Sequence, residues 1–239
     1  MELLQWARAQ GCPWDEHTCA QAALGGHIEV LRYARSQGCP GDEYTYSCAA
    51  RCGHLEIMQW AYEHRCPFTD RYQPLLDACS EGHLEVVRWL WNLAEIPLSS
   101  TFRFMLFAAG HNHIPVLAYL REQGVPWGIG PSDHEPGFDY ANAARLGKIE
   151  ALEWLYRAGC PPTPSVYTQA CIGNRFEVIE WAWRHQFPYD ELALYYAQVE
   201  RLPNIIAWMR KHNFPEQDTS EEEIARYRLI FSSHLNRDD

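Results

Sequence analysis

A proline returns along this chain at a nearly constant spacing. The gaps between successive members of the series are 27, 27, 30, 29, 35, 27 and 27 residues. The members are Pro13, Pro40, Pro67, Pro97, Pro126, Pro161, Pro188 and Pro215. A fixed period of about 20–50 residues is the signature of a solenoid, in which each repeat buries its apolar face only against its neighbours. The spacing therefore predicts one continuous array rather than two globular domains.

Each repeat is predicted to begin with a short helix. The position two residues after the marker proline carries side chains that favour a helix N-cap, namely Asp15, Asp42, Thr69, Ser99, Thr163 and Asp190. Small residues near the end of this first helix, such as Ala22-Ala23, allow neighbouring helices to approach closely. A turn residue follows and is Gly or Asn until the last repeat, as a left-handed helix end requires. The series is Gly26, Gly53, Gly82, Asn112, Gly147, Asn174 and Arg201.

A second helix follows each turn, with apolar residues at helical spacing. A core aromatic residue is predicted seven positions after the turn, in the series Tyr33, Trp60, Trp89, Tyr119, Trp154, Trp181 and Trp208. Glycine ends this second helix at Gly11, Gly38, Gly124 and Gly159, and the marker proline prevents its continuation.

These motifs resemble the ankyrin repeat over about residues 1–215. Residues 26–31 (GHIEVL), 53–58 (GHLEIM) and 82–87 (GHLEVV) are similar to the family's opening of the second helix. The repeat is about six residues shorter than the family's period of about 33. The missing residues belong to the family's β-hairpin finger. The resemblance implies an all-α, ankyrin-like solenoid with reduced or absent fingers, similar to arrays of large DNA viruses and protists.

A helical-hairpin array of the tetratricopeptide type is the alternative fold. Its period of about 34 residues and its own aromatic pattern fit this chain less well. In either case we expect a half-repeat at residues 1–14, seven repeats up to residue 215 with an insertion at 127–137, and a C-terminal capping helix and tail at 216–239.

Composition narrows the class of protein. The formal net charge of −11 argues against nucleic-acid binding, which needs a basic stripe. No apolar run approaches the roughly 18 residues of a membrane span. The nine Cys are an odd number, and Met1 leads directly into repeat sequence. We therefore expect an intracellular, monomeric protein, cytoplasmic or nuclear, with reduced cysteines.

Residues that could carry catalysis or hold a metal are weakly indicated. The series His27, His54, His83 and His113 is set one repeat apart, about 10 Å per solenoid step, which is too far for shared coordination at ~2.1 Å. We expect these rings to bond backbone groups across repeats instead. No phosphate loop, nucleophile elbow or metalloprotease helix motif is present. The sequence therefore predicts a protein that is not an enzyme and that uses no metal or cofactor.

The variable positions are the better candidates for a binding site. The ankyrin resemblance implies binding through the concave face of the first helices, near each turn. The candidates on that face are Arg51, Tyr72, Glu81, Phe102, His111 and Arg145. Exposed aromatic rings beside arginines would form an interface hot spot. The alternative for Tyr72 and Phe102 is packing beneath the two-residue extensions of their own repeats.

The insertion at 127–137 is a second candidate, because insertions in repeat proteins map to one face, often the binding face. Its candidate contacts are Trp127, Asp133 and His134. The alternative is a tolerated loop in which Trp127 only packs at a helix start. A third series lies nine positions after each turn, and packing is the favoured interpretation there: Arg35, Tyr62, Trp91, Arg121, Tyr156, Trp183 and Arg210.

The function these observations predict is a non-catalytic protein–protein interaction module with an unknown protein partner. One alternative is a substrate-recognition or regulatory subunit of an enzyme complex, such as a ubiquitin ligase. The other is a self-associating structural protein.

Overall fold

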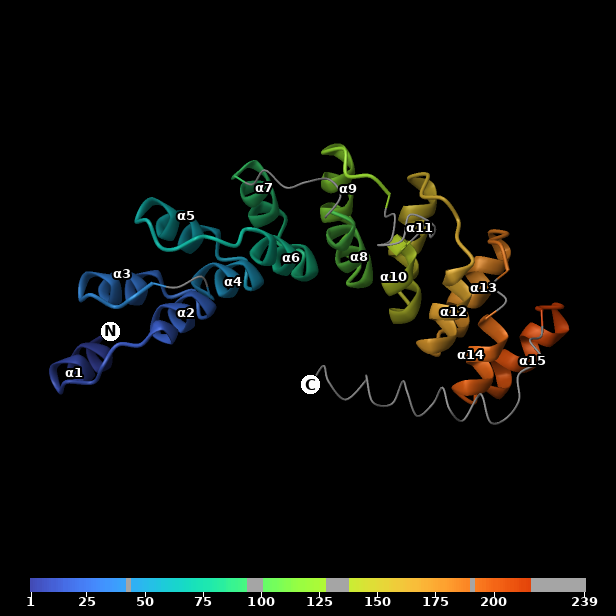
Figure 1. Ribbon diagram of the computed structural model, residues 1–239, viewed down its shortest axis with the longest axis horizontal. Helices are drawn as coiled ribbons and strands as arrows, with labels where there is room; N and C mark the ends of the chain where they lie inside the picture. The colour runs from blue at the N-terminus through green and yellow to red at the C-terminus, as the bar shows by residue number, and fades with distance from the viewer. Residues whose placement is uncertain (42–43, 94–100, 128–137, 190–191, 216–239) are drawn as a thin grey trace. The chain divides into compact units, whose positions relative to one another are not determined.

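The computed structural model describes residues 1–41, 44–93, 101–127, 138–189 and 192–215. It divides into two compact units. The first unit holds residues 1–108 and 115–125, and the second holds residues 109–114 and the chain from 126 onward. Figure 1 shows the succession of helices within each unit. The expected insertion at 127–137 beyond Trp127 and the expected capping helix at 216–239 lie outside the described residues.

Helices follow one another in pairs, as the repeat predicts. The unpaired first helix is α1 (Glu2–Ala9), and the next pairs are α2 (Glu16–Leu24) with α3 (Ile28–Ser36), α4 (Tyr44–Arg51) with α5 (Leu55–Glu63), α6 (Tyr72–Glu81) with α7 (Leu84–Leu93), and α8 (Phe102–Gly110) with α9 (Ile114–Glu122). The later pairs are α10 (Ala141–Leu146) with α11 (Ile149–Arg157), α12 (Ser165–Ile172) with α13 (Phe176–Arg184), and α14 (Ala193–Val199) with α15 (Pro203–Lys211). A short 3₁₀ helix, η2 (Phe138–Tyr140), precedes α10. Among the described residues there is no strand.

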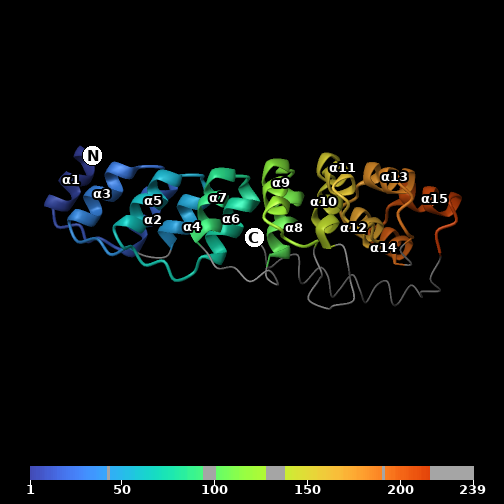
Figure 2. The ribbon, with the colours of Figure 1, turned by 90° about the horizontal axis from the view of Figure 1, so that it is seen from above.

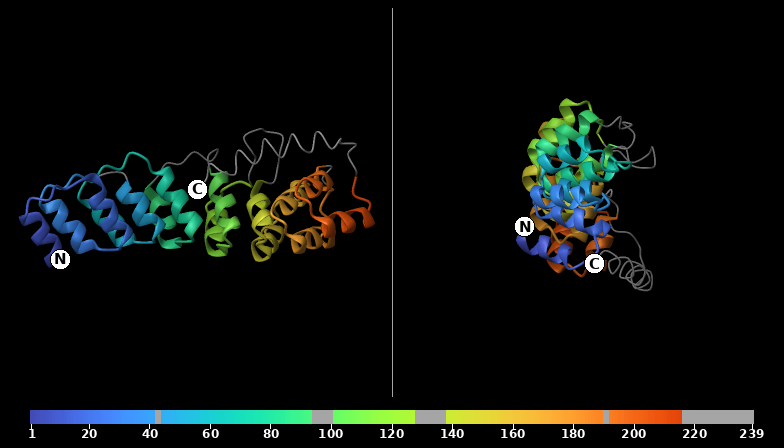
Figure 3. Two further views of the ribbon diagram at one scale, coloured as in Figure 1. Left: turned by 90° about the horizontal axis from the view of Figure 1, so that it is seen from below. Right: turned by 90° about the vertical axis from the view of Figure 1, so that its left-hand side faces the viewer.

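Packing runs in series within each unit. The first helices stack on one another, α2 on α4 and α4 on α6 in the first unit, and α10 on α12 and α12 on α14 in the second. Second helices pack on the first helix of their own pair, α3 on α2, α5 on α4 and α7 on α6 in the first unit, and α11 on α10, α13 on α12 and α15 on α14 in the second. Figures 2 and 3 show the helices of a unit lying across the direction in which its pairs follow one another. The chain is therefore all-helical, with neighbouring helices packed in series inside each unit.

Small side chains form the contact between stacked first helices. The predicted pairs are buried in every described repeat, and they are Ala22-Ala23, Ala49-Ala50, Ala78-Cys79, Ala108-Ala109, Ala143-Ala144 and Ala170-Cys171. Helices of 8–10 residues are marginal in isolation, so most of their stability must come from this packing. The prediction of close helix approach is confirmed within the units.

Left-handed backbone occurs at two positions of the repeat and nowhere else in the described chain. The turn after the first helix has positive φ at Gly26, Gly53, Gly82, Asn112, Gly147, Asn174 and Arg201. The end of the second helix has it at Gly11, Gly38, Arg65, Gly124, Gly159, Gln186 and Asn213. The first series matches the prediction in full. The second adds three non-glycine residues that the sequence pattern did not indicate.

Each left-handed residue closes a Schellman-type helix end. The amide of His54 donates to the carbonyl of Ala49 at 2.9 Å, and the amide of Gly53 donates to Ala50 at 3.2 Å. The end of α3 repeats this geometry, where the amide of Cys39 donates to Ala34 at 3.0 Å. These bonds satisfy carbonyls that a helix end otherwise leaves without partners.

The residue before the marker proline is the apolar plug of the second helix end. A hydrophobic contact at this position commonly accompanies the Schellman motif. The side chain is buried in six of the seven described cases, namely Cys39, Cys66, Val125, Cys160, Phe187 and Phe214. Cys12, in the half-repeat, is exposed. The recurring Cys-Pro pair thus reflects a small buried plug followed by a helix breaker.

Of the predicted N-caps, Asp15 is confirmed and Thr69 is corrected. Asp15 has extended backbone and accepts a bond from the amide of Thr18 at 2.9 Å. Thr69 does not cap α6, because Asp70 accepts from the first amides of that helix instead. Pro164 precedes α12 with helical backbone, and its ring lacks the amide that the start of a helix leaves without a partner, so the cap at Thr163 stays a prediction. Asp42, Ser99 and Asp190 lie outside the described residues.

The aromatic series seven positions after each turn needs a correction. Only Tyr119 and Trp181 are buried, and the other five rings are half-buried. Small residues and aliphatic chains, such as Leu31 and Met58, form the fully buried centre. The large rings lie at the flank of the second helices, where they cover the edge of the core rather than filling it.

Gly173 provides a direct test of the close approach between α10 and α12. A Cβ at this position would lie 1.8 Å from the Arg145 carbonyl oxygen, although its φ of −83° is ordinary helical backbone. Gly173→Ala should therefore destabilise the fold by about 3 kcal/mol or more, because one helix must move. Urea unfolding followed by circular dichroism measures this.

Gly159→Ala is the matched control. Gly159 has a φ of +80° and open space around it, so alanine there introduces backbone strain alone, about 1–2 kcal/mol. A Gly173→Ala variant no less stable than Gly159→Ala would contradict the close packing of α10 and α12.

Candidate functional site

The predicted first-helix candidates divide into exposed side chains and packed ones. Arg51, Glu81, His111 and Arg145 are exposed. Tyr72 is half-buried, and its ring lies 4.9 Å from that of Phe104 in the next repeat, so it packs against that neighbour. The side chain of Phe102 and the residues Asp133 and His134 lie outside what the structure describes.

Trp127 packs rather than projecting. It is half-buried, and its ring lies 6.5 Å from that of Trp154 in an edge-to-face arrangement within the second unit. This contact joins the segment before one helix pair to the second helix of that pair. Trp14 and Tyr33 make the equivalent contact in the first unit at 6.2 Å.

Arg51 lies beside a buried carboxyl group. Its guanidinium is 4.0 Å from Asp77 Oδ2, while Gln73 donates to Asp77 Oδ1 at 2.9 Å. Burial raises the pKa of Asp77, and the bond from Gln73 and the charge of Arg51 oppose that rise. Arg51 therefore also has a structural role, because its positive charge offsets the free-energy cost of holding the Asp77 carboxylate with little access to water.

The backbone of these arginines is held by the next repeat. His83 donates from Nε2 to the Arg51 carbonyl oxygen at 2.9 Å. Arg175, at the same repeat position, donates from Nε to the Arg145 carbonyl oxygen at 3.2 Å. The prediction that the recurring histidine bonds backbone across repeats is confirmed at His83. A cation at the equivalent position of the second unit serves the same purpose.

The same histidine position explains two turn glycines. The ring of His54 lies where a Cβ on Gly26 would be, at 2.8 Å, and the ring of His83 lies at 2.6 Å from that of Gly53. Glycine is required there for its left-handed backbone and again for this close contact.

The third predicted series, nine positions after each turn, connects neighbouring second helices. Three of its four aromatic members make edge-to-face contacts with the ring seven positions after the next turn: Tyr62 with Trp89 at 5.8 Å, Tyr156 with Trp181 at 6.2 Å, and Trp183 with Trp208 at 6.0 Å. The fourth, Trp91, lies 6.4 Å from Phe104. Such pairs contribute about 0.5–1.5 kcal/mol beyond burial. Tyr62, Tyr156 and Trp183 nevertheless keep 44%, 38% and 42% of their surface exposed.

Arginine at this position has a different task. Arg35 donates to the Cys39 carbonyl oxygen at 2.7 Å, and Arg8 donates to that of Cys12 at 3.0 Å. Arg121 makes the same bond to Val125. Each arginine caps the C-terminal end of its own helix, where its positive charge also interacts favourably with the negative end of the helix dipole. These members of the series therefore pack within the array, by ring contacts in some repeats and by capping in others.

A Trp-x-x-x-His pair recurs at the ends of three second helices, a motif that the sequence analysis missed. In each, the histidine Nδ1 bonds the tryptophan carbonyl oxygen at 2.8 Å: His64 to Trp60, His185 to Trp181, and His212 to Trp208. The imidazole also lies against the indole, at 4.1 Å for the first pair. The spacing of four residues was available in the sequence as a signal.

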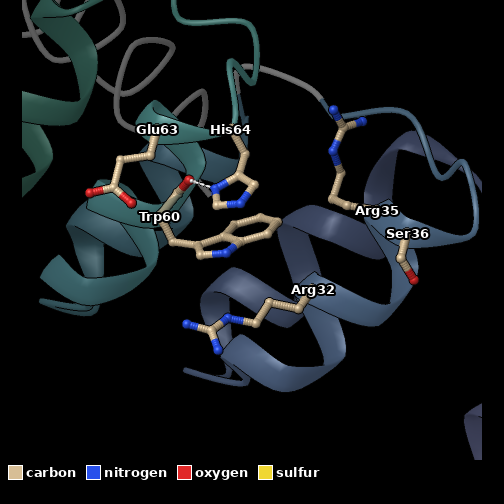
Figure 4. Close-up of a pocket in the computed structure, with 6 residues that line it drawn as sticks. All are labelled: Arg32, Arg35, Ser36, Trp60, Glu63 and His64. Atoms are coloured by element: carbon tan, nitrogen blue, oxygen red, sulfur yellow. Dashed lines mark hydrogen bonds between the residues drawn. The ribbon is translucent and has the colours of Figure 1, made fainter.

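The first of these pairs lines a cavity of about 700 Å³ between α3 and α5 (Figure 4). Its lining residues are Arg32, Arg35, Ser36, Trp60, Glu63 and His64. We call this cavity the α3–α5 groove.

In the second unit, Glu153 of α11 fills the equivalent place against α13. Its carboxylate accepts from Trp181 Nε1 at 3.0 Å, lies 2.7 Å from Arg157, and is 3.4 Å from His185 Nε2. The bond from Trp181 is the main cause that lowers the pKa of Glu153, and the charges of Arg157 and His185 act in the same direction.

The cysteines and histidines form no metal site among the described residues, where no three His, Cys, Asp or Glu side chains converge. The nine cysteines are free thiols. Cys19 Sγ and Cys39 Sγ lie 3.4 Å apart in the core, and burial with this contact raises the pKa of Cys19 to about 12. This thiol therefore stays protonated and behaves as a small apolar side chain.

Within the described ranges, none of the helices has the length and apolar character needed to cross a membrane. No protein-family model matches the chain, and no curated protein is similar to it.

Glu153 gives a testable pH dependence. Its folded pKa lies below its ordinary value of 4.5, so the ionised form stabilises the fold above that value, and this contribution is lost as the pH falls through the lowered pKa. Glu153→Gln should lower stability by about 1 kcal/mol near neutral pH, because a partly exposed charge-assisted bond is lost.

The measurement is urea unfolding of wild type and Glu153→Gln at about pH 7 and about pH 3. The difference between the two proteins should shrink at the lower pH. A difference that stays constant across this range would show that the charge of Glu153 does not contribute.

Proposed function

We propose that this protein is a non-catalytic, ankyrin-like repeat module that binds a partner protein. The proposal is based on the aromatic and arginine side chains of the described helices that stay exposed to solvent. Formation of the core does not require these side chains to be exposed. Aromatic residues and Arg are enriched at protein interfaces and among the residues that dominate binding energy.

The ankyrin-like type is supported by local geometry in both units. Each described repeat has two short helices and a left-handed turn, and in each unit one side chain bonds the backbone of the preceding repeat, His83 to Arg51 and Arg175 to Arg145. The described residues of the connections between pairs contain no strand, in accord with reduced fingers. The resemblance of the sequence and this arrangement point to the same family of folds.

The first-helix ends are the surface we assign to the partner. Arg51 and Glu81 are exposed in the first unit, and His111 and Arg145 are exposed in the second. The backbone of Arg51 and of Arg145 is fixed by the following repeat, so binding would cost little backbone ordering. The insertion at 127–137 stays a second candidate contact.

Arg145→Glu is the most direct test of this surface, because Arg145 holds no described ion pair and its carbonyl contact survives the substitution. Affinity purification from the source cell should recover a specific partner with wild type, and the partner should be lost or reduced about tenfold or more with Arg145→Glu. A second variant lacking residues 128–137 asks whether the insertion contributes.

Arg184→Glu is the matched control. It makes the same charge change on a second helix of the same unit, where Arg184 pairs with Glu180 at 3.2 Å on the surface. Equal loss with both arginine variants would assign the effect to net charge and contradict the proposed surface. The proposed surface would also be contradicted if Arg145→Glu and the variant lacking residues 128–137 both recovered every partner of the wild type.

Self-association is a second candidate, favoured by one specific observation. Helix α1 has no buried residue, and Leu3 and Trp6 are 77% and 61% exposed. Apolar side chains of this size on one short helix are typical of a contact surface.

Size-exclusion chromatography with light scattering separates the two candidates. The interaction-module proposal predicts the mass of a single chain. A defined multiple that returns to a single chain in a Leu3→Glu, Trp6→Glu double variant would favour self-association through α1 instead.

A further inference from the structure

The α3–α5 groove and the contact of α11 with α13 are the same place in two repeats. Trp60 and Trp181 lie seven positions after their turns, and His64 and His185 lie eleven positions after them. Both pairs have the same internal geometry, with the histidine bonded to the tryptophan carbonyl oxygen at 2.8 Å. What differs is the side chain six positions after the preceding turn.

That side chain is a glutamate in one repeat and an arginine in the other. Glu153 offers its carboxylate to the indole N–H of Trp181 at 3.0 Å. Arg32 stands at the equivalent position of α3, and it cannot accept a hydrogen bond. In the described part of the chain, the indole N–H of Trp60 donates to no acceptor. The second unit thus displays the chemical group that the α3–α5 groove lacks.

The charges around the α3–α5 groove suit that missing group. Arg32 lies 3.3 Å from an exposed glutamate of its own helix, a surface pair that contributes little and opens easily. Arg35 donates a hydrogen bond from one guanidinium nitrogen to the Cys39 carbonyl oxygen, and its other N–H groups remain as donors for a ligand. Glu63 is the one acidic residue in the lining, which also holds Arg32 and Arg35, and Glu29 is the surface partner of Arg32. Figure 4 shows both arginines on α3 and the Trp60–His64 pair on α5.

We propose that the α3–α5 groove binds a carboxylate side chain from a short acidic segment of the partner protein, in the place that Glu153 occupies against α13. The indole N–H of Trp60 and the guanidinium of Arg32 are the donors, and arginine suits a carboxylate because it can bind both oxygens. His64 positions the indole by stacking on it at 4.1 Å.

A short acidic segment is favoured over nucleic acid. The chain carries a net charge of −11, which repels a long polyanion, whereas one carboxylate experiences mainly the local arginines. The inference rests on the proposed function, because it names the chemistry of the partner that the repeat module would recognise.

The test is an NMR titration of tryptophan indole N–H signals with a defined probe. The probe is the peptide acetyl-Gly-Glu-Glu-Glu-Gly-amide, and its Gln counterpart is the uncharged control. The Trp60 signal is identified by its loss in Trp60→Phe. It should shift saturably with the Glu peptide and stay in place with the Gln peptide.

Arg32→Glu gives the decisive variant. The substitution places a carboxylate at the position that Glu153 has in the second unit. This carboxylate should fill the α3–α5 groove in place of the peptide and weaken peptide binding about tenfold or more. Arg88→Glu is the matched control, because Arg88 holds the same repeat position in α7 but faces Tyr119 instead of a Trp–His pair. Peptide binding should persist in that variant.

Three outcomes would overturn the inference: no Trp60 shift in wild type, an equal shift in Arg32→Glu, or a larger shift with an oligonucleotide than with the Glu peptide. The proposed function has a separate readout. A cellular partner that is recovered equally by wild type and Arg32→Glu leaves the interaction module standing and removes only the acidic-segment inference.

Discussion

The left-handed residue that closes each helix is the constraint on which the rest of this structure depends. Helices of about two and a half turns are too short to persist alone, so the fold needs them stopped at the right residue and returned onto their neighbours. A single positive-φ residue does both, because it bonds the last carbonyls and reverses the chain. The apolar plug that follows, such as Cys39 or Phe187, then buries itself beneath the helix end.

Once the helix ends are fixed, neighbouring repeats bond through a few recurring positions. The first helices meet through alanine pairs, while His83 and Arg175 tie each repeat to the backbone before it. The second helices meet through rings at their flanks. Because the repeat needs so few positions, the others are free to differ, and this freedom is what a binding module requires. The exchange of glutamate for arginine at one position converts a filled contact into the α3–α5 groove.

The period, the turns and the alanine pairs were predictable because each follows from a local requirement of the backbone or of close packing. The helix starts were less predictable: Asp70 replaced Thr69 as the cap because both lie within reach of the same amides. The half-buried state of Trp60 and Trp89 could not be derived from spacing, since periodicity tells which helix face is apolar but not how far the neighbour covers it. Among the site residues, exposure of Arg51 and Arg145 agrees with the prediction, while Tyr72 packs against Phe104 of the next repeat and Trp127 packs against Trp154.

The central claim is that the array is held by contacts between adjacent repeats, and removal of one whole repeat tests it most directly. Deleting residues 41–67 joins Pro40 to Phe68 and brings the ring of His83 to Gly26, which already accepts a histidine ring from His54. Circular dichroism and thermal unfolding of this variant give the answer. The account predicts unchanged helicity per residue and one cooperative transition. Loss of helicity, or unfolding without a transition, would contradict a fold built from interchangeable neighbours.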